Sequence, residues 1–322
     1  MSEPLILAIP SKGRLQENAD EFFARAGLEI KKSGGSRTYM GAIAGVPGVE
    51  VAFLSASEIS RQLADGTVHL GVTGEDLLRE NIPNADSKVH ILAPLGFGFA
   101  NVIVAVPQSW IDVSTMGDLD DVAAGRYAKT GDRMRVATKY VNLTRTFFES
   151  YGLADYRIVE SQGATEGAPA SGSAELIVDI TTTGATLAAN ALKILDDGTI
   201  LQSEANLVAS LNAAWSPVAR TALTTMLTRI AADLQGRNLR EVRFELADGK
   251  IVDEACRQFG CTVFRNNNGA LTLHVPAKNL YPLVDWLREQ GAGSIGVARL
   301  DYIFEVKNPL YEGLSARLGW AS

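Results

Sequence analysis

The sequence predicts an α/β protein with more than one domain, and three observations support this. The chain has 322 residues, which exceeds the ~100–200 residues of a typical domain. Hydrophobic residues make up 46% and charged residues 21% of the chain, an ordinary globular balance. Short apolar runs alternate with helix-like segments. We therefore expect large buried cores and no extensive disorder.

The first two thirds of the chain alternate strand and helix patterns. Leu5–Ile9 is an apolar run typical of a central parallel strand, and the helical pattern after it ends at Gly27, a typical C-cap. The uncharged stretch Val89–Ile111 is broken by prolines and glycines, so it predicts strands and crossings and not a membrane span. Further strands are predicted at Val49–Leu54, Val68–Val72, Asn101–Val106, Arg135–Thr138 and Glu175–Ile180, and helices at Leu143–Tyr151 and Thr186–Leu195.

Two glycine-marked positions divide the chain. The segment Pro94–Asn101 predicts a crossing between two lobes, and the chain returns near Leu192. A helical pattern over Pro217–Gln235 ends at Gly236, where we place a domain boundary. The predicted parts are lobe one from residues 1–104 plus 192–236, lobe two from 105–191, and a C-terminal domain from 237–322. Two lobes imply a cleft.

The C-terminal domain is predicted to be a βαββαβ sandwich, a ferredoxin-like arrangement. Its two central strands are joined by the turn signal Asn266–Gly269. The predicted elements are a strand at Glu241–Leu246, a helix at Ile251–Phe259, strands at Cys261–Arg265 and Leu271–Val275, a helix at Leu280–Gln290 and a strand at Ser294–Phe304.

Charge and cysteine content exclude several classes of protein. The chain has 37 acidic and 30 basic residues and a net charge of −7, so we expect no nucleic-acid or membrane partner. Cys256 and Cys261 are predicted to be buried thiols, because no histidine is near enough in sequence to suggest a zinc site. The short first apolar run lacks a basic leader, which predicts no signal peptide and a cytoplasmic location.

The segment Glu175–Leu187, ELIVDITTTGATL, carries the strongest functional pattern. An apolar strand ends in Asp179 and continues through a threonine-rich loop and Gly184 into a predicted helix. Backbone N–H groups and hydroxyls in such a loop bind phosphate, and the acid accepts hydrogen bonds from sugar hydroxyls. The alternative is an ordinary turn in which Thr183 or Thr186 caps the helix, but this explains only one of the threonines.

A second candidate is SKGRL, Ser11–Leu15, between the first strand and the first helix. Lys12 and Arg14 place two positive charges beside helix N–H groups, which suits a polyphosphate. The alternative is a solvated loop in which Ser11 caps the helix. Hydrolase, P-loop and nicotinamide sites are not supported, because no GxSxG, HExxH, GxxxxGK[ST] or complete GxGxxG motif occurs.

Two further segments carry acids near predicted loops. GVTGEDLL, Gly71–Leu78, places Glu75 and Asp76 in a first helical turn, where they either favour the helix dipole or accept hydrogen bonds from a base or ribose. SQGATEGAPASG, from residue 161 to 172, either brings Glu166 toward the phosphate loop or is a surface loop.

The stretch Glu166–Leu187 resembles the signature of the ATP phosphoribosyltransferase family. SKGRL and GVTGEDLL are similar to motifs of that family in the same order, and the resemblance covers residues 5–236. The tail from residue 237 resembles, more loosely, the regulatory domain of the long form of the family. The residues that match the signature are Glu166, Gly172, Ala174, Ile177, Asp179, Thr183, Gly184, Thr186 and Leu187.

The resemblance implies a two-lobed, periplasmic-binding-protein-like α/β core with a ferredoxin-like regulatory domain. It implies a pentosyltransferase that transfers phosphoribosyl from 5-phosphoribosyl 1-diphosphate to N1 of ATP and releases pyrophosphate, the first step of histidine biosynthesis. It also implies a requirement for Mg²⁺, inhibition by histidine and assembly into a homo-oligomer.

The resemblance also assigns roles to residues, without naming metal ligands. The catalytic residues expected are Asp179, Lys12 and Arg14. The residues expected to bind the phosphoribosyl donor are Glu166, Asp179, Thr181, Thr182, Thr183, Gly184, Ala185 and Thr186. The residues expected to bind ATP are Gly13, Leu15, Gly74, Glu75 and Asp76.

The chain departs from the family pattern at two places. Ser55 stands where the family commonly has an arginine, so Lys12, Arg14 or Arg61 would assist the departing pyrophosphate. The tail reads CRQFGCTVFRNNNG where the long form has a proline- and glycine-rich turn. The alternatives are a two-lobed small-molecule-binding module, another phosphoribosyltransferase with a nitrogenous acceptor, and an inactive regulatory paralogue. The order of the three motifs favours ATP phosphoribosyltransferase.

Overall fold

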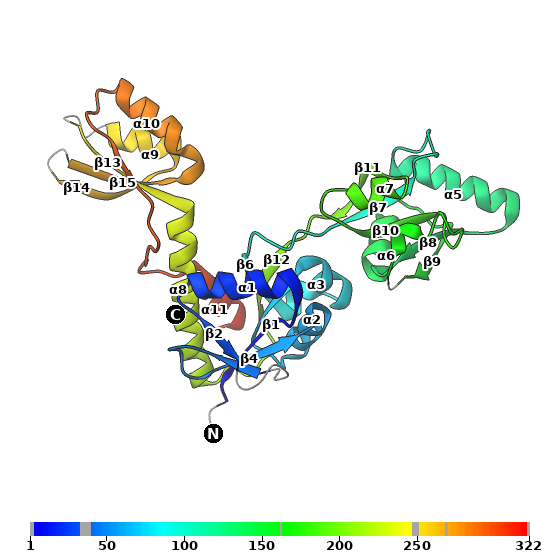
Figure 1. Cartoon of the computed structure of the whole chain (residues 1–322), viewed down its shortest axis with the longest axis horizontal. Coiled ribbons are helices and arrows are strands. Elements are labelled where there is room, and N and C mark those ends of the chain that lie inside the picture. The colour runs from blue at the N-terminus through cyan, green and yellow to red at the C-terminus, as the bar shows by residue number, and fades with distance from the viewer. Residues whose placement is uncertain (1–2, 33–39, 162, 247–250, 268–269, 321–322) are drawn as a thin grey trace. The chain divides into compact units, whose positions relative to one another are not determined.

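The computed structural model describes residues 3–32, 40–161, 163–246, 251–267 and 270–320 (Figure 1). Its strands form sheets of seven, five and four strands. The chain divides into two compact units, residues 1–21, 31–43 and 48–219, and residues 22–30, 44–47 and 220–322. Among the described helices, none is long and apolar enough to cross a membrane.

The seven-stranded sheet has β1 (Leu5–Pro10) at its centre. β1 pairs in parallel with β4 (Val49–Leu54) and β5 (Leu70–Gly74). β1 and β5 are largely buried, as is typical of central parallel strands, whereas buried residues alternate with more exposed ones along β4. The sheet order is β2-β3-β4-β1-β5-β12-β6. The remaining elements of this part are β2 (Ile30–Lys32), β3 (Met40–Ile43), β6 (Val89–Pro94), β12 (Ala205–Ser210), α1 (Gly13–Arg25), α2 (Ala56–Asp65), α3 (Glu75–Asn81) and α4 (Ala85–Lys88).

The five-stranded sheet has the order β11-β7-β10-β8-β9 and is packed on both faces. Val104 of the second strand belongs to a core that contains Phe148, whereas the next residue, Ala105, belongs to a core that contains Leu187. This alternation follows from the two-residue period of a strand. The elements are β7 (Asn101–Pro107), β8 (Met134–Thr138), β9 (Tyr156–Glu160), β10 (Leu176–Thr181), β11 (Leu192–Leu201), α5 (Met116–Thr130), α6 (Val141–Ser150), η1 (Thr165–Gly167) and α7 (Ala185–Ala189).

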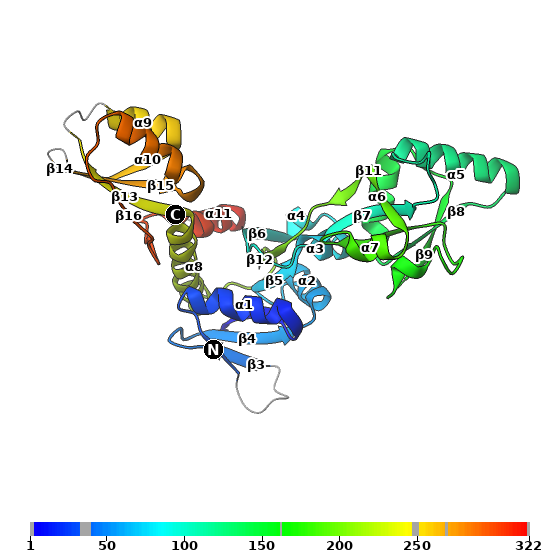
Figure 2. The ribbon, with the colours of Figure 1, turned by 45° about the horizontal axis from the view of Figure 1, so that its top comes forward.

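Two crossings, β6 to β7 and β11 to β12, connect these two sheets (Figures 1 and 2). They are hydrogen-bonded to each other, because the N–H of Ala100 donates to the carbonyl of Ser203 at 2.8 Å and the N–H of Ala205 donates to the carbonyl of Phe97 at 2.9 Å. The chain therefore passes from one sheet to the other at residues 95–100 and 202–204, and not at the predicted boundaries 104 and 192. β11 joins the second sheet because it pairs with β7, a contact between distant segments.

Two predicted helices differ from the structure. The helix predicted over Thr186–Leu195 ends after α7, because the chain from Leu192 onward forms β11. α8 (Pro217–Asn238) continues past Gly236, the predicted helix end. A Cβ atom at Gly236 would lie 2.5 Å from the carbonyl oxygen of Asp301, so the glycine permits a close backbone approach and does not stop the helix.

The four-stranded sheet confirms the predicted βαββαβ order. Its strands are β14, β15, β13 and β16 in sheet order, and α9 and α10 lie side by side (Figure 2). Val242, Leu273 and Leu283 lie in the core of this domain. The bounds are β13 (Leu239–Glu245), α9 (Ile251–Phe259), β14 (Thr262–Asn267), β15 (Ala270–Pro276), η2 (Ala277–Asn279), α10 (Leu280–Glu289) and β16 (Gly296–Ala298).

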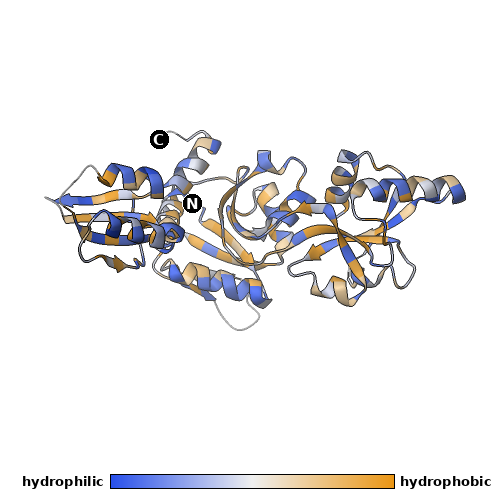
Figure 3. Ribbon diagram, turned by 90° about the horizontal axis from the view of Figure 1, so that it is seen from above, coloured by the Kyte–Doolittle hydropathy of each residue, from blue (hydrophilic) through white to orange (hydrophobic). Residues whose placement is uncertain are grey.

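Several details of the C-terminal part were not predicted. The strand predicted over Ser294–Phe304 is only the short β16, and α11 (Pro309–Leu318) had no counterpart. The predicted turn falls partly outside the described residues, which omit 268–269. Cys261 is buried, whereas Cys256 is only half-buried, and both thiols are free. Apolar strands and helices of mixed polarity recur in each part of the chain (Figure 3), and both strands and helices contribute buried residues to the cores.

Candidate functional site

The loop that follows β10 lines a cavity of about 340 Å³. β10 is the central strand of its sheet, and the cavity lies at its carboxyl end, where α/β proteins usually bind ligands. The structure thus brings most of the predicted donor-binding residues to one cavity. The lining residues are Ala100, Glu166, Asp179, Ile180, Thr181, Thr182, Thr183, Ala185, Thr186 and Leu187.

The threonines of this loop have different partners. The hydroxyl of Thr181 accepts the N–H of Gly184 at 2.8 Å, and Gly184 has a φ of 74°, which suits glycine. The hydroxyl of Thr182 donates to the carbonyl of Phe99 at 3.0 Å. Thr183 is exposed, and within the described part of the chain its hydroxyl has only a long contact of 3.4 Å with the N–H of Ala185. Two hydroxyls therefore hold the loop in place, and the third is available to a ligand.

Asp179 is a half-buried carboxylate with spare capacity to accept hydrogen bonds. One oxygen accepts the N–H of Ile180 at 2.8 Å. Burial raises the pKa of Asp179, the negative charge of Glu166 raises it further, and the Ile180 N–H and the positive charge of Lys139 oppose this shift. A carboxylate whose burial is incompletely compensated is typical of a functional site.

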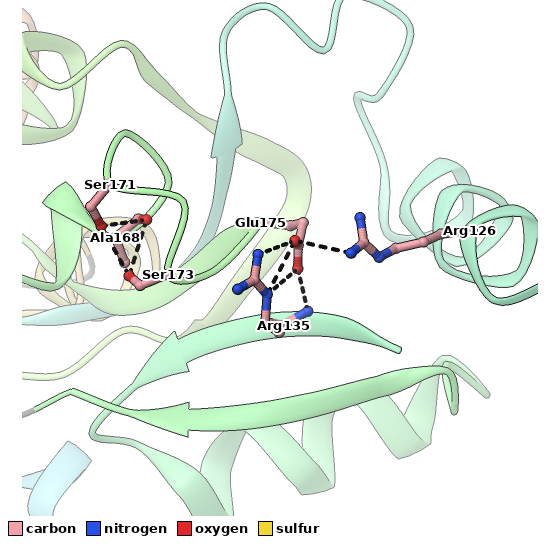
Figure 4. A network of polar contacts seen from close by, with 6 residues as sticks. All are labelled: Arg126, Arg135, Ala168, Ser171, Ser173 and Glu175. Atoms are coloured by element: carbon pink, nitrogen blue, oxygen red, sulfur yellow. Dashed lines mark hydrogen bonds and ion pairs between the residues drawn. The ribbon is translucent and has the colours of Figure 1, made fainter. Parts of the chain in front are cut away.

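A network of polar contacts fixes the chain segment that leads into β10 (Figure 4). The hydroxyls of Ser171 and Ser173 donate to the carbonyl of Ala168 at 3.0 and 3.2 Å, closing the turn after Glu166. Glu175 accepts the side chain of Arg135 at 2.6 Å, and Arg126 lies 3.4 Å from the same oxygen. The start of β10 is thereby fixed by side chains of β8 and α5.

The SKGRL motif lies in the turn from β1 into α1. The side chains of Lys12 and Arg14 are exposed, and neither lines the cavity. Leu15 packs against the crossing, because a Cβ atom at Gly98 would lie 2.8 Å from its Cδ1. Since the carbonyl of the next residue, Phe99, accepts a hydrogen bond from Thr182, this motif and the loop after β10 contact the same short crossing.

The GVTGEDLL motif forms the end of β5 and the start of α3, with Gly74 as the N-cap. Glu75 accepts the side chain of Arg79 at 3.2 Å and remains partly exposed. The environment of the Asp76 side chain differs from the prediction that it faces a ligand. It is 5% exposed, and its two oxygens accept the hydroxyls of Tyr140 at 2.8 Å and Ser203 at 2.9 Å. Asp76 therefore ties the first lobe to the second.

A second acid of α3 joins the same two parts. Glu80 accepts the backbone N–H groups of Asn142 and Leu143, each at 3.0 Å, and so caps the start of α6. The sequence pattern does not indicate this pairing, nor does it place Lys139 and Tyr140 near Asp179. A signal for the last two was present, because they directly follow the predicted strand Arg135–Thr138.

Ser55 has a local structural role. It is the N-cap of α2, and its hydroxyl accepts the N–H of Glu58 at 3.2 Å. Arg61 lies in the second turn of α2, is exposed, and donates through Nε to the carbonyl of Ser57 at 3.3 Å. Ser55 therefore stabilises the start of α2.

Metal binding would depend on few protein ligands. Within the described part of the chain, no group of three or more histidine, cysteine or acidic side chains is placed to hold a metal ion. Asp179 and Glu166 are the carboxylates among the residues that line the cavity. This arrangement fits an ion that arrives with a phosphate ligand and takes one or two carboxylates from the protein.

The sequence is similar to known phosphoribosyltransferases. A profile of ATP phosphoribosyltransferase matches residues 55–232. The chain is 59% identical to the ATP phosphoribosyltransferase of Bradyrhizobium diazoefficiens and 57% identical to that of Rhodopseudomonas palustris strain BisB18, and each alignment covers 99% of both chains. Among solved structures, a chain of the ATP phosphoribosyl transferase (HisG:HisZ) complex from Thermotoga maritima is similar over 70% of this chain and 96% of that one, with a TM-score of 0.54 and 25% identity.

Proposed function

The chain belongs to the ATP phosphoribosyltransferase family, and from this premise we propose how its residues carry out the reaction. It is a glycosyltransferase of histidine biosynthesis, and the family implies ATP and 5-phosphoribosyl 1-diphosphate as substrates. The observation that carries the proposal is the cavity at the end of β10, which is lined by the threonine-rich loop after Ile180 and by the carboxylates of Asp179 and Glu166.

The loop after β10 binds the donor and Asp179 orients it. The N–H groups of the loop and the hydroxyls of Thr183 and Thr186 bind the 5′-phosphate, and Thr181, Thr182, Gly184 and Ala185 give the loop its shape. Asp179 and Glu166 accept hydrogen bonds from the ribose hydroxyls. Residues 181–186 therefore fix the sugar from one side, so that its C1 faces the ATP.

The reaction needs positioning more than acid–base chemistry. A bond forms between N1 of adenine and C1 of the ribose, while the bond from C1 to the pyrophosphate oxygen breaks and its electron pair leaves with pyrophosphate. C1 becomes oxocarbenium-like, and the carboxylate of Asp179 stabilises this positive charge. Holding both substrates in one site lowers the activation barrier further.

The motifs of the first lobe bind the acceptor and the leaving group. Lys12 and Arg14 bind the triphosphate of ATP or the departing pyrophosphate, and Arg61 supplies the positive charge that Ser55 lacks. The acceptor is bound by Gly13, Leu15, Gly74 and Glu75. Asp76 supports that side through its hydrogen bonds to Tyr140 and Ser203.

The family needs a divalent metal, and Mg²⁺ is the ion proposed here. Asp179 and Glu166 would be its protein ligands, with the remaining positions taken by substrate oxygens and water. When bound, the ion neutralises the negative charge of the diphosphate and makes pyrophosphate a better leaving group.

Three further properties belong to the proposal. Histidine acts as an inhibitor through the C-terminal domain, residues 237–322. The chain forms a homo-oligomer, for which Phe264, 62% exposed on β14, offers an apolar contact. The reaction takes place in the cytoplasm, where its nucleotide substrate is made and used.

The test is the absorbance of the N1-substituted adenine product in a mixture of the protein, ATP, 5-phosphoribosyl 1-diphosphate, Mg²⁺ and a pyrophosphatase. We expect product, and we expect less of it when histidine is added. Product that histidine does not reduce would remove the proposed inhibition. If no product forms while a substrate still binds, the chain is an inactive paralogue.

A further inference from the structure

The donor cavity has an unusual charge balance for its proposed ligand. Its described lining includes the carboxylates of Glu166 and Asp179 but no lysine or arginine. A phosphoribosyl diphosphate carries negative charge at both ends, so two carboxylates would repel it unless a positive charge lies near. Loop N–H groups contribute only partial charges, and α7, with five residues, adds a small dipole. Mg²⁺ held by Asp179 and Glu166 would offset the charge of these two acids, and a cation of the protein just outside the lining residues would add attraction for the phosphates of the donor.

Lys139 is placed to supply this charge. β8 and β10 run in parallel with Thr138 paired to Val178, so Lys139, the residue after the end of β8, lies in register beside Asp179 of β10. The side chain of Lys139 is exposed and forms no ion pair within the described part of the chain. Its positive charge nevertheless acts on Asp179, since it opposes the rise in that residue's pKa caused by burial.

The segment that carries Lys139 is held rigidly by its neighbour. Tyr140 is 1% exposed, its N–H donates to the hydroxyl of Thr138 at 2.8 Å, and its own hydroxyl donates to Asp76 at 2.8 Å. Burial and the adjacent carboxylate of Asp76 raise the pKa of Tyr140, so the hydroxyl stays protonated and continues to donate. The Nζ of Lys139 lies 5.1 Å from the centre of this fixed ring, which limits where the ammonium can go.

We propose that the ammonium of Lys139 binds a phosphate or diphosphate group of the phosphoribosyl donor beside Asp179. This inference rests on the proposed function and adds a residue to its site. The ammonium is a compact charge with three donors, which suits phosphate oxygens without fixing one geometry. The competing interpretation is that Lys139 only offsets the acids of the cavity and does not touch the ligand.

The test compares Lys139→Gln and Lys139→Arg with Lys129→Gln, an exposed lysine of α5 that does not line the cavity. Steady-state kinetics give the KM for each substrate, and thermal unfolding confirms that every variant is folded. We expect Lys139→Gln to raise the KM for the donor about tenfold, the loss of one charge-assisted contact. The KM for ATP should stay within about twofold, Lys139→Arg should keep most of the affinity, and Lys129→Gln should match the wild type.

Calorimetric titration with pyrophosphate and with ribose 5-phosphate identifies the group that is bound. A loss of affinity in Lys139→Gln for pyrophosphate alone assigns Lys139 to the diphosphate, and a loss for ribose 5-phosphate alone assigns it to the 5′-phosphate. An unchanged donor KM and unchanged affinity for both probes would overturn the inference while the wild type remains active. A wild type without activity would instead contradict the proposed function, and the two failures are therefore distinguishable.

Discussion

Glu175, just before β10, and Asp179, within β10, have opposite environments. Burial works against the charge of Glu175, but the hydrogen bonds and positive charges of Arg135 and Arg126 outweigh it, and the pKa of Glu175 is lowered. Asp179 is also half-buried, yet no arginine or lysine pairs with it among the described residues, and its pKa is raised. The two acids are four residues apart in the same segment.

The difference separates an acid that stabilises the fold from one that is available to a ligand. Glu175 has a partner for each of its oxygens and holds β10 against β8 and α5. Asp179 stays partly desolvated and incompletely bonded, which costs folding free energy unless a ligand supplies the missing contacts. Asp76 and Glu80 resemble Glu175, because their carboxylates accept hydrogen bonds from other residues of the protein. Glu166 resembles Asp179, because it lines the cavity.

The largest expected effect is on activity, in Asp179→Asn. The amide keeps the oxygen that accepts the Ile180 N–H but removes the charge, so kcat/KM for the donor should fall about 100-fold, equivalent to about 2.7 kcal/mol. The free energy of unfolding at pH 7 should rise by about 1 kcal/mol, because an uncompensated buried charge is gone. Kinetics and urea unfolding measure the two effects. Unchanged kinetics would remove Asp179 from the site.

The next effect is on stability, in Glu175→Gln. Loss of the carboxylate leaves Arg135 and Arg126 without their shared partner, and we expect about 2 kcal/mol of destabilisation in urea unfolding. The KM for the donor should be unchanged below the unfolding transition. If this variant loses donor affinity as strongly as Asp179→Asn, the division between the two acids is wrong.

A smaller effect is expected for the hydroxyl that is free to meet the ligand. Thr183→Val should raise the KM for the donor about tenfold, equivalent to about 1.4 kcal/mol, because one hydrogen bond to a charged phosphate is lost. Thr183→Ser restores the hydroxyl and is the matched control. Equal donor KM values for the valine and serine variants would count against a phosphate contact of Thr183.

The smallest effect is the pH dependence of stability. The folded pKa of Glu175 is below its ordinary value of 4.5, so its stabilisation is present above that pH and is lost as pH falls through the lowered pKa. The folded pKa of Asp179 is above its ordinary value of 3.8, so its cost is present at neutral pH and disappears as pH falls through the raised pKa toward 3.8. At neutral pH, Glu175→Gln should be less stable and Asp179→Asn more stable than the wild type. Both differences should shrink as the pH falls, which urea unfolding midpoints between pH 7 and 3.5 measure.

Much of the fold could be predicted from local pattern. Val49–Leu54 and Ile251–Phe259 were predicted with the bounds that the structure has, because each has a clear period and clear ends. The lobe boundaries were misplaced, since the membership of β7 and β11 in the second sheet depends on their pairing with each other across some ninety residues of sequence. The role of Gly236 depends on Asp301, which no local pattern contains.

The lining of the cavity could be predicted where one continuous segment supplies it. The loop from Thr181 to Thr186 was identified because strand, acid, threonines and glycine are consecutive. The partners of Asp76 were not, because Tyr140 and Ser203 are distant in sequence and meet it only after folding. Lys139 could have been considered as a site residue, since it follows a predicted strand. Its proposed role, however, depends on its position beside Asp179 of the neighbouring strand, which the sequence does not show.

The most direct test of the donor site is calorimetric titration of the wild type, Asp179→Asn and Glu175→Gln with 5-phosphoribosyl 1-diphosphate and Mg²⁺ in the absence of ATP. We expect the wild type and Glu175→Gln to bind the donor with the same Kd and Asp179→Asn to bind it at least about tenfold more weakly. Equal affinity in Asp179→Asn and the wild type would contradict the claim that the cavity at the end of β10 binds the donor.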